Sequence, residues 1–163
     1  MAGTPILTQI ETNMQTLIEG MTVAGGYNYN WGTVNQRDYA KCKFPSAVID
    51  LEPEELNMDE AGGMQADAYL NETFFRITVV GKTSKAKSNP VFEQRKVMNK
   101  ALDDLKQLFG INYNLTGVCD TIMYRRSVRV EKPNGDILIP AEMETFWRVQ
   151  YTQSRTDPTV PDP

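Results

Sequence analysis

Apolar residues recur at helical spacing near the start of the chain. Between residues 5 and 21 they fall at intervals of three and four, which aligns them in one stripe along a helix: Leu7, Ile10, Met14, Leu17 and Met21. Thr4 and Pro5 suit the N-cap and the first helical position. We therefore expect an amphipathic helix over Ile6 to Glu19.

A second apolar stripe has the same period and predicts a helix from Pro90 to Phe109. Asn89 suits its N-cap, and Gly110 stands where a glycine commonly ends a helix. The stripe consists of Met98, Ala101, Leu102, Leu105, Leu108 and Phe109.

Four other segments have the composition or alternation of β-strands. A short run between Pro45 and Pro53 predicts a strand near a sheet edge, because proline cannot donate to a ladder. The segment from Tyr69 to Gly81 is partly apolar on both faces, which predicts a central strand. Two further alternating segments, Thr121 to Glu131 and Ile137 to Tyr151, flank a turn with the Asn-Gly pair of a hairpin, Lys132 to Asp136.

The order of these elements predicts an α+β fold in a single domain over residues 1–154. A helix, two strands joined by a long loop, a second helix and a hairpin indicate a mainly antiparallel or mixed sheet with both helices on one face. A length of 163 residues with 40% hydrophobic residues suits one compact core. Residues 155–163 contain three prolines and few apolar groups, so we expect an extended tail.

The composition excludes much of enzyme chemistry, because the chain contains no histidine. It cannot form a Ser-His-Asp or Cys-His site, and it lacks the commonest transition-metal ligand. Cys42 and Cys119 form no CxxC pair, so we expect buried, reduced thiols. Nucleotide-binding and EF-hand motifs are also missing from the sequence. We expect no catalytic residue, no cofactor and no metal, although a carboxylate pair brought together in space stays open.

Two charged clusters are candidate contact surfaces. The acidic cluster lacks the ligand spacing of a calcium loop, which favours a solvated loop; it contains Asp50, Glu52, Glu54, Glu55, Asp59 and Glu60. The basic cluster contains Lys82, Lys85, Lys87, Arg125, Arg126 and Arg129. It would face an acidic partner or the phosphates of DNA, or it is an exposed loop and strand whose arginines pair with Glu142 or Glu144. The net charge of −4 argues against a polyanion binder as a whole.

Three alternating aromatic residues, Tyr27, Tyr29 and Trp31, predict a short extended segment followed by a polar loop. Large amphipathic rings are favoured at half-wet contact surfaces, and they equally well cover the end of a sheet. Both interpretations stay open. The paired aromatics at Phe74-Phe75 and Phe146-Trp147 fit core packing better than the stacking surface of an RNA-binding sheet.

Four features follow one another in a fixed order over nearly the full chain. They are the opening helix at Ile6–Glu19, the strand at Tyr69–Gly81, the helix at Pro90–Phe109, and a last strand reading Phe146-Trp147-Arg148-Val149-Gln150-Tyr151 before a tail that contains Asp157-Pro158. This order resembles the tail terminator or tail-completion proteins of tailed bacteriophages.

The resemblance implies a virion protein that forms a homo-hexameric ring after assembly in the host cytoplasm. Such a ring caps the tail tube, ends its polymerisation and contacts the neck or head-completion protein, with the sheath as a further partner. DNA passes through it without sequence-specific binding, and no membrane is involved.

Each subunit of a ring needs two different, complementary patches, which the acidic and basic clusters would supply. The C-terminal extension would lie along a neighbouring subunit. The alternatives are another neck component such as a head-closure or adaptor protein, a small carboxylate-dependent hydrolase, and a nucleic-acid-binding module.

Overall fold

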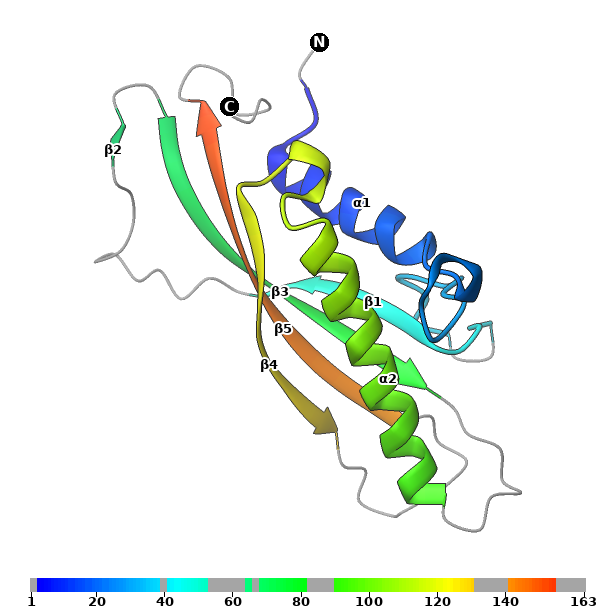
Figure 1. Ribbon diagram of the computed structural model, residues 1–163. Coiled ribbons are helices and arrows are strands. Elements are labelled where there is room, and N and C mark those ends of the chain that lie inside the picture. Colours follow the sequence, from blue (N-terminus) through cyan, green and yellow to red (C-terminus); the bar gives the residue numbers. More distant parts are fainter. Residues whose placement is uncertain are drawn as a thin grey trace.

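The described part of the chain forms two α-helices and an antiparallel sheet in the expected order, which confirms the α+β class (Figure 1). The structure, a computed structural model, describes residues 3–38, 41–52, 64–65, 68–81, 90–130 and 141–154. The helices are α1 (Ile6–Glu19) and α2 (Pro90–Ile111), with 3-10 turns η1 (Val23–Gly25) and η2 (Leu115–Gly117). The strands are β1 (Ser46–Leu51), β2 (Met64–Gln65), β3 (Ala68–Gly81), β4 (Thr121–Val130) and β5 (Ala141–Ser154).

The strands lie in the order β1-β3-β5-β4, and the short β2 also pairs with β3. The two long strands β3 and β5 pair from Ala68↔Ser154 to Gly81↔Ala141 and form the centre of the sheet. β1 pairs with β3, and β4 pairs with β5, so these two strands form the edges. The predictions of an edge strand after Pro45 and of a central strand ending at Gly81 are both confirmed.

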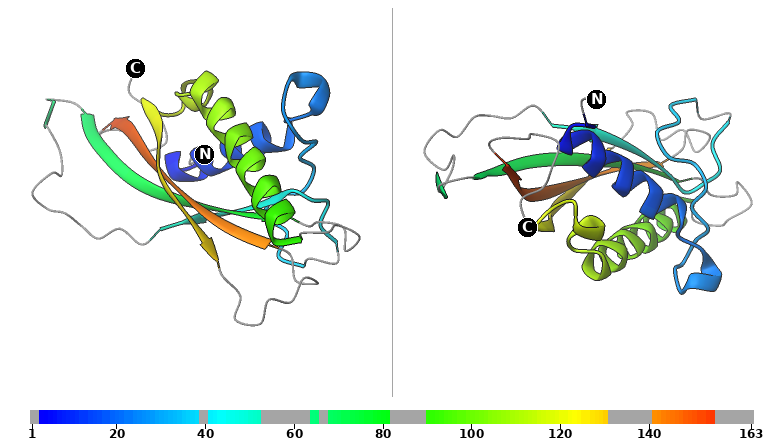
Figure 2. Two further views of the ribbon diagram at one scale, coloured as in Figure 1. Left: turned by 60° about the horizontal axis from the view of Figure 1, so that its bottom comes forward. Right: turned by 90° about the horizontal axis from the view of Figure 1, so that it is seen from above.

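Both helices cover the same face of the sheet (Figure 2), as expected. Every second residue from the middle of β3 and along β5 faces them and is buried: Thr73, Phe75, Ile77, Val79, Met143, Thr145, Trp147, Val149 and Tyr151. The indole of Trp147 meets the rings of Phe109 and Tyr124 edge-on, with centroids 4.8 and 5.4 Å away. Its Nε1 donates to Thr145 Oγ1 (2.8 Å), so the polar atom inside this apolar layer has a partner.

The helices differ from the prediction at two boundaries and in the buried stripe of α1. Pro5, rather than Thr4, precedes the first residue of α1. The buried stripe of α1 also turns slightly, because Ile6 and Ile18 are fully buried while Leu7 and Leu17 lie at its margin, packed against the core.

The second helix continues through Gly110 to Ile111, so Gly110 does not end it. The Asn112 N–H donates to Leu108 O at 2.9 Å and prolongs the helical hydrogen bonding. The chain reverses later, where Leu115, Thr116 and Gly117 have positive φ. The reversal, rather than the first glycine after the apolar stripe, therefore sets where the helix ends.

Several predictions concern residues outside the described ranges. These are the loop over 54–63, the basic linker over 82–88 with Asn89, the turn over 132–136 and the tail over 155–163. Both cysteines are free thiols: Cys119 is buried as expected, whereas Cys42 is partly exposed.

Candidate assembly surface

The face of the sheet turned away from α1 and α2 is a candidate contact surface, because both described helices pack on the other side (Figure 2). Its accessible part lies away from Val48 and Val80, which are 7% and 1% exposed. The strand register aligns its side chains in rows that cross the sheet. From β1 to β4 two of these rows read Val48, Thr78, Glu144, Val128 and Asp50, Arg76, Phe146, Arg126. We call this surface the open face.

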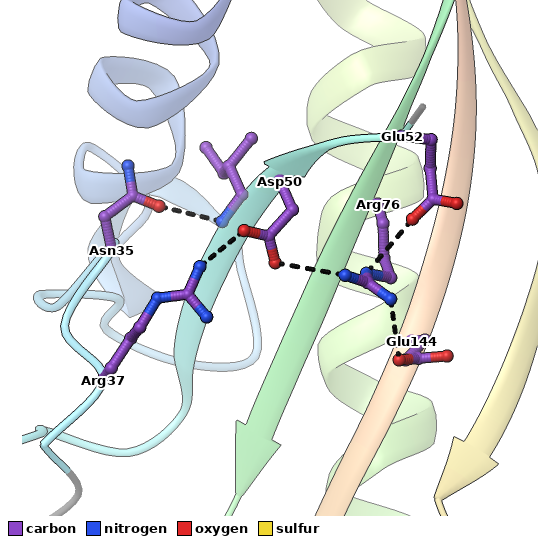
Figure 3. Close-up of polar contacts among 7 residues, drawn as sticks. Asn35, Arg37, Asp50, Glu52, Arg76 and Glu144 are labelled. Carbon is purple, nitrogen blue, oxygen red and sulfur yellow. Dashed lines mark hydrogen bonds and ion pairs between the residues drawn. The ribbon is translucent and has the colours of Figure 1, made fainter. Parts of the chain in front are cut away.

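Arg76 lies at the centre of an ion cluster on the open face (Figure 3). Its guanidinium lies 3.2 Å from Glu52 Oε1, 3.6 Å from Asp50 Oδ2 and 3.4 Å from Glu144 Oε1. Arg37 binds the other oxygen of Asp50 at 2.5 Å. Three carboxylates and two guanidiniums thus join β1, β3 and β5, and the cluster carries one excess negative charge. A second ion pair, Arg148 with Glu72, lies further along the same face.

The outer edge of β1 is closed by the chain segment that precedes it. The Ala47 N–H donates to Thr33 O (3.2 Å), and Ala47 O accepts from the Asn35 N–H (2.8 Å). The side-chain Oδ1 of Asn35 then accepts from the Ile49 N–H at 2.8 Å (Figure 3). These contacts occupy the backbone groups with which another strand would pair.

A β-bulge divides the arginines of β4 between the two faces of the sheet. The register shifts between Tyr124 and Arg126, so the simple alternation expected from the sequence is wrong beyond this point. Arg126 lies on the open face, with its guanidinium 4.5 Å from the Phe146 ring centroid. Arg129 lies on the helix side and donates to Asn99 Oδ1 of α2 at 2.8 Å. The expected pairing partner Glu144 binds Arg76.

The same bulge places the side chains of two valines on the open face. Val128 and Val130 lie opposite Glu144 and Glu142 on the open face, and they are 43% and 38% exposed. Met123 lies on the same face and is 38% exposed. The edge strand β4 therefore presents an apolar stripe together with cationic side chains, as contact surfaces do.

The aromatic segment before β1 is structural. Trp31 is 2% exposed and belongs to the core, so it cannot contribute to a contact surface of the folded chain. Tyr27 and Tyr29 are partly buried and pack against the same core. The segment is a loop after η1 rather than a strand, since its only ladder-like contact is the bridge of Val34 to Ala47 among the described residues.

The loop is held by a buried carboxylate that the sequence interpretation missed. Asp104 of α2 is fully buried and accepts from the Asn28 N–H (2.7 Å), Asn28 Nδ2 (2.8 Å), the Tyr29 N–H (3.2 Å) and Trp31 Nε1 (3.1 Å). A signal was present, because Asp104 lies on the apolar stripe, three residues after Ala101 and four before Leu108. An acidic residue on a buried stripe indicates a buried polar contact.

Burial alters the acidity of two tyrosines and one thiol in the described part of the chain. Burial, and then the charge of Asp104, raise the pKa values of Tyr27 and Tyr29 above 10.0. Burial, and then the charge of Asp120, raise the pKa of the Cys119 thiol to about 12. A thiol with so high a pKa stays protonated at neutral pH and is a poor nucleophile.

The predicted acidic and basic clusters are described only in part. Asp50 and Glu52 belong to the ion cluster, whereas Glu54, Glu55, Lys82, Lys85 and Lys87 lie outside the described ranges. No group of three or more possible metal ligands occurs among the described residues. In the same part of the chain, neither helix is long and apolar enough to span a membrane.

No protein-family model matches the chain, and no curated protein matches it. We therefore argue the function from the surface and from the order of the elements along the chain.

Proposed function

We propose that this protein is a structural component of a tailed-bacteriophage virion. Copies of it associate head to tail into a closed homo-hexameric ring that caps the tail tube, stops its polymerisation and joins the tail to the neck or head. The chain acts by shape and contact, and it transforms no substrate.

The observation that carries the proposal is the difference between the two edges of the sheet. A cyclic ring requires two unlike surfaces on every subunit, each complementary to the other. β1 forms one edge, closed by Asn35 and flanked by the carboxylates of Asp50 and Glu52. β4 forms the opposite edge, which carries exposed arginines and valines. Unlike charges at opposite edges would orient neighbouring copies in one direction around an axis.

The fold lends further support to a contact role. The long strands β3 and β5 pair along their whole length, and aromatic and branched side chains are buried on their helix side. The charges on the open face are largely paired with one another, through Arg76 and Arg148. Paired charges of this kind stay solvated in the free subunit and form the polar part of a contact surface.

Light scattering and native mass spectrometry on the purified chain, alone and with purified tail tubes, test the proposal. We expect a hexamer-sized particle, or a ring formed at one end of the tube and visible by electron microscopy. A chain that stays monomeric and never associates with tubes contradicts the ring. Salt-sensitive binding of duplex DNA by such a monomer would favour the nucleic-acid-binding module instead.

A further inference from the structure

We infer that the outer edge of β4 pairs with a second copy of this chain, which presents the acidic edge of its own sheet. The inference rests on the proposed self-assembly and names the surface through which it occurs. Three features of β4 support it: its free backbone, its exposed apolar side chains and its charge.

The backbone of β4 has unused pairing capacity beyond the bulge. Before the bulge, the Ile122 N–H points away from β5 and donates to Tyr113 O at 2.7 Å, which closes that part of the edge. Beyond it, in the shifted register, the backbone N–H and C=O groups of Arg126, Val128 and Val130 face β5. The alternation of an antiparallel ladder then directs the backbone groups of Ser127 and Arg129 outward. Within the described ranges, no hydrogen bond joins these backbone groups to a residue outside the sheet.

The side chains beside this free edge are available for contact. All six residues from Arg125 to Val130 are exposed. On the open face Met123, Val128 and Val130 form an apolar stripe next to the unpaired backbone. An unpaired edge with exposed apolar side chains is a template for another strand.

The charge identifies the occupant. Three arginines and no acid occur between Arg125 and Val130, so two β4 edges brought together antiparallel would place like charges against each other. The β1 edge of a second copy instead offers Asp50 and Glu52, which are paired with Arg76 and, at Asp50, with the exposed Arg37. Together with Glu144 of β5 their cluster keeps one excess negative charge. Closure of that edge ends at Ile49, so Leu51, which is 49% exposed, is the first residue beyond it on this edge. The contact is therefore head to tail, from β4 of one copy to the end of β1 of the next.

A proline placed on the free edge tests the backbone contact. Ser127→Pro removes an outward N–H and leaves the pairs of β4 with β5 intact, because an edge strand tolerates proline on its solvent side. Ser127→Ala is the matched control, since both variants lose the hydroxyl that accepts from the Tyr124 hydroxyl at 3.1 Å and only the proline loses the N–H. Circular dichroism and thermal unfolding check that both variants fold. We expect Ser127→Ala to assemble like the wild type and folded Ser127→Pro to stay monomeric.

A second pair of variants keeps the test decisive if the proline variant fails to fold. Val128→Lys places a charge on the apolar stripe, and Val23→Lys places one on a valine of η1 that is also exposed (56% against 43%) and lies away from β4. We expect the first to weaken assembly about tenfold and the second to leave it unchanged, measured as the dissociation constant by analytical ultracentrifugation.

Assembly of Val128→Lys, or of folded Ser127→Pro, at the wild-type affinity overturns the β4 contact and leaves the proposed ring standing. A wild-type chain that remains monomeric with tubes present overturns both. Duplex DNA binding that is lost in Arg125→Glu, with assembly retained, also overturns the β4 contact and assigns the arginines to DNA.

Discussion

Replacing Asp104 by alanine should cost more stability than any other single change to a charged residue of α2. The variant removes the common acceptor of four hydrogen bonds from the loop over residues 28–31. The indole N–H of Trp31 lies in the core, where water cannot replace the lost oxygen. The donors of Asn28 and Tyr29 are only partly buried, so water recovers some of their loss.

The magnitude follows from these environments. A buried donor left without a partner costs about 1–3 kcal/mol, and hydrogen bonds to a charged group are at the upper end. Complete loss of the hydrogen bond from Trp31 and partial loss of those from Asn28 and Tyr29 should together lower the free energy of unfolding by roughly 4 kcal/mol. Alanine returns about 0.5 kcal/mol through its higher helix propensity. We expect a net destabilisation of about 3.5 kcal/mol, a large share of the roughly 5–15 kcal/mol typical of a domain.

Urea unfolding followed by circular dichroism measures this change, and Asp103→Ala is the matched control. Asp103 precedes Asp104 on the same helix and is exposed, so its replacement should change stability by less than about 0.5 kcal/mol. Tryptophan fluorescence gives a second readout, because Trp31 should become more exposed in Asp104→Ala and shift its emission to the red. Equal stabilities of the two variants would refute the view that Asp104 holds the loop.

Three further predictions test other parts of the structure. Gly117→Ala should destabilise the fold by about 1 kcal/mol because Gly117 has φ +91. Gly110→Ala should stabilise it by about 0.5 kcal/mol, because Gly110 lies inside α2 and an added Cβ would meet no atom within 4 Å. Stability changes of the same sign in urea unfolding would contradict the observed helix end. Arg76→Met should destabilise by roughly 1 kcal/mol because it leaves Asp50, Glu52 and Glu144 without their shared cation, and exposed Arg125→Met should have no effect in the same assay. The pKa of Cys119 is raised in the folded state, so the free energy of unfolding should be unaffected by this thiol below pH 9 and should fall as the pH rises toward 12, by up to about 1.4 kcal/mol per pH unit. Cys119→Ala should reduce this pH dependence of the unfolding free energy, and Cys42→Ala should leave it unchanged.

Periodicity was sufficient to predict the main elements because each one buries a continuous apolar face. The stripe from Met98 to Phe109 and the alternation of β5 have no competing interpretation, and both lie where they were expected. Helix ends were less predictable, because Gly110 can occupy either a helical or a left-handed position and the downstream turn at Leu115–Gly117 decides between them.

The candidate surface was predictable only in its composition. Opposite charges near β1 and on β4 are readable from the sequence, but their places at opposite edges depend on β3 and β5 lying between them. Trp31 could not be assigned, because an aromatic residue suits a core and a contact surface equally well until its partner is known. That partner, Asp104, lies 73 residues away along the chain.

The bulge in β4 connects the fold to the proposed assembly. Without the extra residue, Val128 and Val130 would lie on the helix side with Ile122 and Tyr124, and Arg129 would face away from the helices. The chain instead exposes two valines on the open face and places Arg129 against Asn99 of α2. The helix-side positions at this end of β4, Ser127 and Arg129, are themselves exposed, so the bulge costs the isolated subunit little burial. It places both valines on one face beside the outward backbone groups of β4, where a second copy seated on β4 would bury them.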